Sequence, residues 1–193
     1  MSVNTDPQKI EQLLTRGVEN VYPNKEFLEE LLKSGKKLKL YLGIDPTGPS
    51  LHLGHAISLM KLRQFQELGH TVIMLIGSFT AMIGDPTDKL AVRQPLTRKQ
   101  VLANCKNYEN QAASILDMKK TEVKYNNKWL DKLNFKDIVE IAGKFTVQQM
   151  LERDMFENRM KEGKPIGLHE FLYPLMQGYD CVAMKVDGEI GGN

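Results

Sequence analysis

The stretch of sequence that decides the fold is LKLYLGIDPTGPSLHLGHAISLMKLRQFQELGHTVIMLI (residues 38–76). Three alternating leucines at its start predict a strand over residues 38–44, with the leucines on one face and Tyr41 on the other. A helix over 55–68 follows, and then a continuous apolar run over 71–76, as expected for a strand buried on both faces. Strand, helix and strand in this spacing form a βαβ unit, which is right-handed and gives a parallel sheet.

The flanking sequence extends this pattern in both directions. Before it, two amphipathic helices begin near Asp6 and Pro23 and make an N-terminal unit over residues 1–36. The elements expected after it are a glycine-containing loop over 77–95, a long helix over 96–116 capped by Thr97, a strand over 122–125, two or three short helices over 135–160, a helix over 168–179 and a strand over 181–185. Alternating β and α elements predict an α/β, Rossmann-like, doubly wound parallel sheet over residues 37–193.

Composition narrows the class of protein. The chain is 41% hydrophobic and 26% charged, which is ordinary for a globular domain, and its net charge of +2 is too small to indicate nucleic-acid binding by bulk field. Cys105 and Cys181 show no metal-ligand spacing, so we expect no protein-bound metal and a reduced, cytoplasmic location. The longest apolar run is too short to cross a bilayer, so no membrane association is expected. The chain stops at Asn193 with no helix end or tail, which we interpret as truncation at the C-terminus.

The first candidate site is the histidine pair of His52-Leu53-Gly54-His55, where a strand has ended and a helix begins. Backbone N–H groups at a helix start favour phosphate, and each histidine can donate a hydrogen bond to it. Gly54 lets a flat group such as adenine approach the backbone closely. The motif alone is equally compatible with two surface histidines beside a helix cap, but the loop from Gly43 to Gly48 directly before it favours ATP binding.

A second candidate site follows the second strand. Asp85 lies in a loop that should face the same crevice as the histidines, because ligands of open α/β sheets bind beyond the carboxyl ends of the strands. Its carboxylate could hold an ammonium group, and Lys89 and Arg93, four residues apart, could clamp a pyrophosphate. The alternative is an Asx-type turn followed by two solvated cations.

A third candidate site is the polar stripe formed by Tyr173, Gln177 and Asp180, which are spaced i, i+4 and i+7. Pro174 is compatible with a helix here only if the helix begins near Phe171. Spacing alone favours an ordinary helix with surface polar residues, and the presence of the other two candidate sites is what favours a binding role.

The segments Tyr41–His55, Ile83–Thr87 and His169–Asp180 resemble class I aminoacyl-tRNA synthetases, and among them the bacterial tyrosyl-tRNA synthetases. The resemblance runs from roughly residue 40 onward. It implies activation of tyrosine with ATP to give tyrosyl-adenylate, and transfer of the tyrosyl group to tRNA(Tyr). It also implies that magnesium accompanies the ATP.

The resemblance gives each matching residue a role. The residues it places on the ATP phosphates and pyrophosphate are Thr47, His52, His55, Lys89 and Arg93. The residues it places on tyrosine are Tyr41, Asp85, Tyr173, Gln177 and Asp180. In this set the phenol hydroxyl is bound by Tyr41 and Asp180, and the other three hold the ammonium group. The residues it places at the ATP site more broadly are Gly43, Asp45, His52, Gly54, His55 and Gly192.

The resemblance also implies an assembly and a gap. A helical insertion over about 126–165 matches the homodimer interface of the family, although its apolar residues could equally form internal core. The family's Asp-Gln pair, second ATP signature loop and anticodon-binding domain are absent, so we expect binding with poor activity. Two alternatives remain open, a His-x-Gly-His nucleotidyltransferase and a non-catalytic synthetase-like module. A phenol-binding pair, Tyr41 with Asp180, would distinguish the synthetase from the nucleotidyltransferase. The presence of His52, His55, Asp85 and Asp180 together argues against the non-catalytic module.

Overall fold

The computed structural model describes residues 3–84 and 96–191. Its centre is a four-stranded sheet in the order β3-β2-β1-β4, in which every pairing is parallel. The strands are β1 (Lys39–Ile44), β2 (Thr71–Ile76), β3 (Thr121–Tyr125) and β4 (Gly188–Ile190). Because β1 and β2 pair in parallel with Lys39 opposite Thr71 and are joined by α3 (Leu53–Glu67), the predicted βαβ unit is confirmed.

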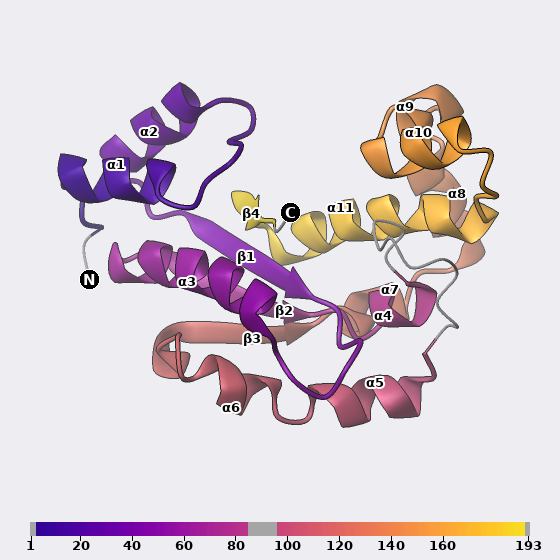
Figure 1. Cartoon of the computed structure of the whole chain (residues 1–193), viewed down its shortest axis with the longest axis horizontal. Coiled ribbons are helices and arrows are strands. Elements are labelled where there is room, and N and C mark those ends of the chain that lie inside the picture. The colour runs from indigo at the N-terminus through magenta and orange to yellow at the C-terminus, as the bar shows by residue number, and fades with distance from the viewer. Residues whose placement is uncertain (1–2, 85–95, 192–193) are drawn as a thin grey trace.

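Each face of the sheet is covered by helices (Figure 1). One face packs against α3 and against α5 (Arg98–Cys105) and α6 (Tyr108–Ala112). The strand residues of this larger core are Leu40, Leu42, Ile44, Val72, Met74 and Ile76. The other face is covered by α11 (Leu172–Met184) and α7 (Asn127–Leu130), whose Met184 and Trp129 pack with Tyr41, Ile73 and Leu75. Successive apolar side chains of β1 and β2 point to opposite faces of the sheet and enter two different cores. Both faces of the sheet are therefore covered by helices.

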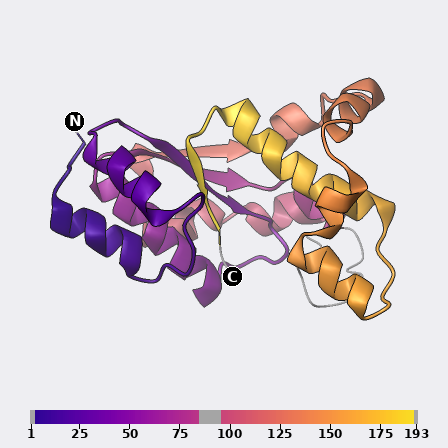
Figure 2. The ribbon, with the colours of Figure 1, turned by 90° about the horizontal axis from the view of Figure 1, so that it is seen from above.

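Helical segments lie at opposite ends of the sheet, as Figure 1 and Figure 2 both show. At one end are α1 (Pro7–Thr15) and α2 (Lys25–Lys33), which are capped by Asp6 and Asn24 and bury four apolar side chains. At the other end are α8 (Phe135–Ala142), α9 (Val147–Leu151) and α10 (Asp154–Lys161), with 3₁₀ turns at Met118–Lys120 and Leu168–Phe171 completing the described elements. In the parts of the chain that the structure describes, no helix is long and apolar enough to cross a membrane.

Two expectations about α11 and β4 need correction. The strand expected over 181–185 is wrong, because α11 continues to Met184 and ends at Lys185 in a left-handed conformation (φ 52°). A short apolar run cannot by itself distinguish a strand from a buried helix segment. The strand comes later, as β4, and pairs with β1. The helix does begin at Leu172, so Pro174 lies in its first turn, where proline is tolerated.

Two other boundaries also differ from expectation. The long helix expected over 96–116 is divided into α5 and α6 by a turn at Lys106 and Asn107, although Thr97 caps α5 as predicted. The glycine-containing loop after β2 includes a short helix, α4 (Thr80–Ile83). The rest of that loop, residues 85–95, lies outside the described residues.

Candidate functional site

The most buried polar group on α11 is the carboxylate of Asp180, which is 3% exposed. Its two oxygens accept hydrogen bonds from Trp129 Nε1 at 2.6 Å and from Asn126 Nδ2 at 3.2 Å. Burial raises the pKa of Asp180 to about 6, although both hydrogen bonds oppose this by stabilising the charged form. The group is therefore a carboxylate at neutral pH, held in a fixed orientation by two neutral donors.

Tyr41 projects from β1 into the same cluster of side chains. It is 1% exposed and packs with Trp129 and Cys181, and its hydroxyl lies 3.3 Å from Cys181 Sγ. Burial raises the pKa of Tyr41 far above its ordinary value, so the hydroxyl keeps its proton. The structure thus brings Tyr41 beside the residue that follows Asp180. A phenol hydroxyl placed there could meet a hydroxyl and a carboxylate.

A second carboxylate, the partly buried Asp45, directly follows β1. It accepts hydrogen bonds from Tyr173 Oη at 2.9 Å and from Thr80 Oγ1 at 2.6 Å. Gly77 leaves the space for this arrangement, because a Cβ at that position would lie 1.7 Å from Asp45 Oδ1. Residues from α11, α4 and the end of β2 therefore fix the first carboxylate of the β1–α3 loop.

Asn126 joins the two carboxylates. Its Nδ2 donates to Thr80 Oγ1 at 3.1 Å as well as to Asp180, and its Oδ1 accepts from the Phe79 N–H at 2.8 Å. The side chain is 1% exposed, so all of these bonds lie away from solvent. The hydrogen bonds run without a break from Tyr173 through Asp45, Thr80, Asn126 and Asp180 to Trp129. This is one connected polar network in which each member orients the next.

Sequence reasoning missed Thr80, Asn126 and Trp129 as site residues. Asn126 directly follows β3, at the carboxyl end of the sheet where ligands of such folds bind, and that placement is the signal that could have found it. No comparable signal marks Thr80 or Trp129, since their partners are set by how α4 and α7 pack against α11.

The predicted stripe on α11 is divided between two environments. Tyr173 and Asp180 belong to the buried network, as described above. Gln177 instead turns its Nε2 to Glu189 Oε1 at 2.7 Å, at the end of β4. The structure therefore brings two of the three predicted residues together and places the third beside β4.

The histidine pair lies at the start of α3, on a more open surface. His52 and Gly54 are exposed and His55 is half-buried, and the two rings lie 3.9 Å apart between centroids. The His52 N–H donates to His55 Nδ1 at 3.1 Å, so neutral His55 carries its proton on Nε2 and can donate from there. Burial, and then the neighbouring His52, lower the pKa of His55, which favours the neutral ring. Thr47 and Gly43 are also exposed, on the loop and strand before the pair.

Residues 33–193 match the family described as tRNA synthetases class I (W and Y). The chain belongs to this family. It is 53% identical over 184 residues to a tyrosine--tRNA ligase of Carboxydothermus hydrogenoformans, covering 94% of this chain and 45% of that protein. It is 55% identical over 179 residues to one of Legionella pneumophila (strain Lens), covering 93% of this chain and 44% of that protein. The chain therefore spans less than half the length of these relatives.

A solved structure agrees with the sequence matches. A C-terminally truncated mitochondrial tyrosyl-tRNA synthetase of Aspergillus nidulans superimposes with a TM-score of 0.80 at 29% identity, covering 91% of this chain and 53% of the other. The fold of this synthetase-family chain is thus shared with a tyrosyl-tRNA synthetase over nearly its whole length.

Four residues singled out in this family member lie outside the described residues. They are Asp85, Lys89, Arg93 and Gly192. Their roles remain predictions.

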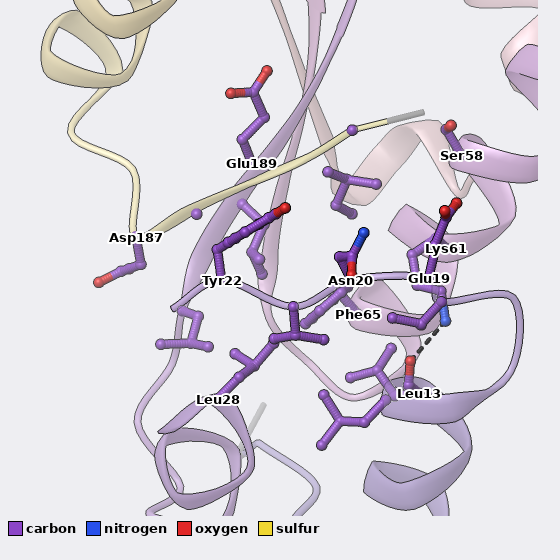
Figure 3. A pocket seen from close by; sticks show the side chains of 18 of the residues that line it. Leu13, Glu19, Asn20, Tyr22, Leu28, Ser58, Lys61, Phe65, Asp187 and Glu189 are labelled. Carbon is purple, nitrogen blue, oxygen red and sulfur yellow. Dashed lines mark hydrogen bonds between the residues drawn. The ribbon is translucent and has the colours of Figure 1, made fainter. Parts of the chain in front are cut away.

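Two hollows lie elsewhere in the described part of this synthetase-family fold. The larger, of about 950 Å³, lies between the connection from α1 to α2, α3 and β4, and Figure 3 shows Tyr22, Lys61 and Glu189 around it. Lys61 Nζ is held there by the Leu13 and Arg16 carbonyls at the end of α1. Of the residues predicted to bind tyrosine, this hollow contains Gln177.

The smaller hollow, of about 270 Å³, lies between α4, α7, α8 and α11 and is largely apolar. No residue of the connected network lines either hollow. The candidate site therefore rests on the polar network and the histidine pair.

Proposed function

We propose that this chain is the tyrosine- and ATP-binding catalytic part of a tyrosine--tRNA ligase. Family membership and the similarity to two tyrosine--tRNA ligases support an aminoacyl-tRNA synthetase. The observation that carries the choice of tyrosine is the Asp180 carboxylate, buried, oriented by two donors and adjacent to the residue that contacts the Tyr41 hydroxyl. A site built to hydrogen-bond a hydroxyl rejects the analogue that lacks it, because its buried polar groups would be left unpaired.

On this proposal, the phenol hydroxyl of tyrosine donates to Asp180 and accepts from Tyr41. Tyr41 would exchange its contact with Cys181 for the substrate. Tyr173, Gln177 and Asp85 would hold the ammonium group. The position of Tyr173, bonded to Asp45 at the carboxyl end of β1, supports an ammonium site between the phenol end and the phosphate end.

The phosphate end would be formed by the β1–α3 loop and the start of α3. Thr47, His52 and His55 would donate to the phosphates, while Lys89 and Arg93 would contact the pyrophosphate. The wider ATP site would include Gly43, Asp45, Gly54 and Gly192. The exposure of Thr47, His52 and Gly54, and the Nε2 proton of His55, support this placement. Residues 3–84 and 96–191 contain no cluster of three His, Cys, Asp or Glu suited to a metal, so magnesium would be bound mainly through the ATP phosphates.

The reaction would need little proton transfer by the protein. A tyrosine carboxylate oxygen attacks the α-phosphorus of ATP, the bond to the bridging oxygen breaks, and pyrophosphate leaves with that electron pair. The donors at the start of α3 would stabilise the charge that develops on the phosphates. The fixed carboxylate of Asp180 would hold the phenol end of tyrosine, so that the amino acid is in position for the attack. Transfer to tRNA(Tyr) would complete the cycle.

The exposed apolar residues of α8 to α10 support a homodimer. Phe135, Val139, Phe145, Val147 and Met160 are each about half or more exposed, which favours burial against another surface. We propose that the partner is a second copy of this chain, in the cytoplasm, where the free cysteines Cys105 and Cys181 would stay reduced.

Calorimetric titration of the chain with tyrosine, phenylalanine and ATP tests the proposal. We expect tyrosine to bind far more tightly than phenylalanine. We also expect Tyr41→Phe, which keeps the buried ring and deletes one hydroxyl, to weaken tyrosine binding by about 10-fold. Equal affinity for the two amino acids would contradict tyrosine specificity. Binding of ATP without tyrosine would favour a His-x-Gly-His nucleotidyltransferase, and binding of neither would favour a non-catalytic module.

A further inference from the structure

The loop from Pro46 to Leu51, which joins β1 to α3, is held by hydrogen bonds from side chains of α5 and α6. Asn104 Nδ2 donates to the Pro46 carbonyl at 2.9 Å, and Tyr108 Oη donates to the Gly48 carbonyl at 2.6 Å.

The third residue to contact the loop is Gln111, which makes two bonds. Its Nε2 donates to the Pro49 carbonyl at 3.2 Å and its Oε1 accepts from the Leu51 N–H at 2.7 Å. Three side chains of α5 and α6 thus contact four backbone groups of one loop.

These three side chains form a stripe. Asn104, Tyr108 and Gln111 are spaced i, i+4 and i+7, and they share a direction although the helix is interrupted between α5 and α6. Tyr108 is 1% exposed and packs in the main core beside Cys105 and Ala112. Tyr108 therefore attaches the stripe to the main core, and the hydrogen bonds from the stripe set the position of the loop.

The contacts leave the opposite side of the loop open. They use backbone carbonyls and one backbone N–H, while Thr47 and His52 remain exposed. A loop with two prolines has few N–H donors of its own, so its shape depends on partners from outside. The stripe therefore fixes where the loop presents its side chains without occupying the surface that a ligand would contact.

We propose that Asn104, Tyr108 and Gln111 are positioning residues for the phosphate end of the site. They hold the loop so that Thr47 and the start of α3, with His52 and His55, meet the phosphates of ATP in a fixed geometry. This inference rests on the proposed function. A displacement of about 1 Å in a catalytic group can lower the rate by about 100-fold, so a preset loop has a direct effect on catalysis.

The test uses the 193-residue chain with single substitutions. Gln111→Ala removes both bonds to the loop, and Gln111→Glu keeps the acceptor for the Leu51 N–H. Tyr108→Phe keeps the buried ring and removes the hydroxyl. Asn110→Ala, at an exposed position of the same helix, serves as the matched control. Hydrogen exchange at the Leu51 amide and calorimetric affinities for ATP and tyrosine are measured for each.

We expect Gln111→Ala to speed exchange at the Leu51 amide by about 10-fold, as for loss of one net hydrogen bond, and Gln111→Glu to restore most of the protection. We expect Gln111→Ala and Tyr108→Phe to weaken ATP binding by about 10-fold, with tyrosine affinity within about 2-fold of wild type. Asn110→Ala should change neither. A role confined to stability would instead weaken both ligands equally and would not be rescued by Gln111→Glu.

Three outcomes overturn the inference: unchanged exchange at Leu51 in Gln111→Ala, parallel loss of ATP and tyrosine affinity, or tyrosine binding by a wild-type chain that does not bind ATP. Failure of the proposed function is a separate result, in which the wild-type chain does not distinguish tyrosine from phenylalanine. The exchange measurement needs no ligand, so it tests the attachment of the loop in either case.

Discussion

The proposed amino-acid end and the proposed phosphate end of the site differ in how they are built. At the proposed amino-acid end, the buried Asp180 carboxylate is held by donors from Trp129 and Asn126. Hydrogen bonds continue from Asn126 through other side chains as far as Tyr173. At the phosphate end, His52 is exposed and its N–H bonds to the ring of His55. On the proposed function, selectivity would belong to the end where geometry is fixed by buried side chains. The exposed phosphate end would bind the phosphates of ATP. Its loop backbone is held by hydrogen bonds from side chains of α5 and α6.

The largest effect is expected from Asp180→Ala, which removes the buried carboxylate of the proposed amino-acid end. The substitution leaves the Trp129 and Asn126 donors unpaired, at a cost of about 1–3 kcal/mol each. It should also remove a preference for tyrosine over phenylalanine that can reach about 10⁵ in sites of this kind. Thermal unfolding and the two amino-acid affinities measure these effects. Unchanged discrimination would place recognition of the phenol elsewhere, and Asp180→Asn, which keeps one acceptor, serves as the milder variant.

Gly77→Ala should produce the next largest effect. The new Cβ would lie 1.7 Å from Asp45 Oδ1 and 2.5 Å from Thr80 Oγ1, so both must move. We expect a loss of about 1–3 kcal/mol in the free energy of unfolding, typical of overpacking. The control is Gly178→Ala in α11, where an added Cβ meets nothing within 4 Å and a helical alanine should stabilise by about 0.5–1 kcal/mol. Chemical denaturation curves that coincide for the two variants would refute the close approach.

The pH dependence of tyrosine binding sharpens the comparison further. The pKa of Asp180 is raised to about 6 by burial, so the carboxylate gains a proton as the pH falls through 6. A protonated group is a poorer acceptor for a phenol hydroxyl, so tyrosine affinity should fall below pH 6.

Stability should respond to Asp180 in the opposite direction. The folded chain keeps this proton up to a higher pH than the unfolded chain, so the contribution of Asp180 to stability is greatest below the ordinary carboxyl pKa. This contribution to stability is lost as the pH rises toward 6.

Isothermal titrations with tyrosine from pH 5 to pH 8 test the predicted pH dependence of binding. They should show the transition in wild type, and the same transition in Asp180→Asn would assign it to another group.

The smallest effect is expected at the histidine pair. Burial lowers the pKa of His55, so the ring is neutral at pH 7 and gains charge only in more acidic solution. ATP affinity should therefore rise modestly as the pH falls, by about 1 kcal/mol, which is the difference between a charge-assisted and a neutral hydrogen bond. His55→Gln should abolish the rise while leaving thermal stability within about 0.5 kcal/mol, as for other surface positions. A steep fall in stability would show that the pair is structural.

Sequence patterns anticipated the centre of the fold better than its connections. The strand over 71–76 and the alternation of Leu40, Tyr41 and Leu42 were predicted correctly, because period and apolar content directly record burial on a sheet. The run at 181–185 was misassigned, since four apolar residues fit a buried helix end equally well.

The polar network shows the limit more clearly. Asn126, Thr80 and Trp129 are distant in sequence from Asp180, and no local pattern specifies that their side chains meet. Their roles follow from how α4, α7 and α11 pack, which single-sequence periodicity does not encode. By contrast, the histidine pair is a local motif that can be read from the sequence, and the structure places its two rings in contact.

Strand β1 has one further consequence, which concerns errors in folding. Its even-numbered leucines enter one core, while Tyr41 points to the other side of the sheet. Because side chains alternate with a period of two, a slip of one residue against β2 would exchange these sets and bury Lys39 where a leucine belongs. A strand misaligned by one residue would therefore lose its buried leucines and also withdraw Tyr41 from the cluster with Ile73 and Leu75.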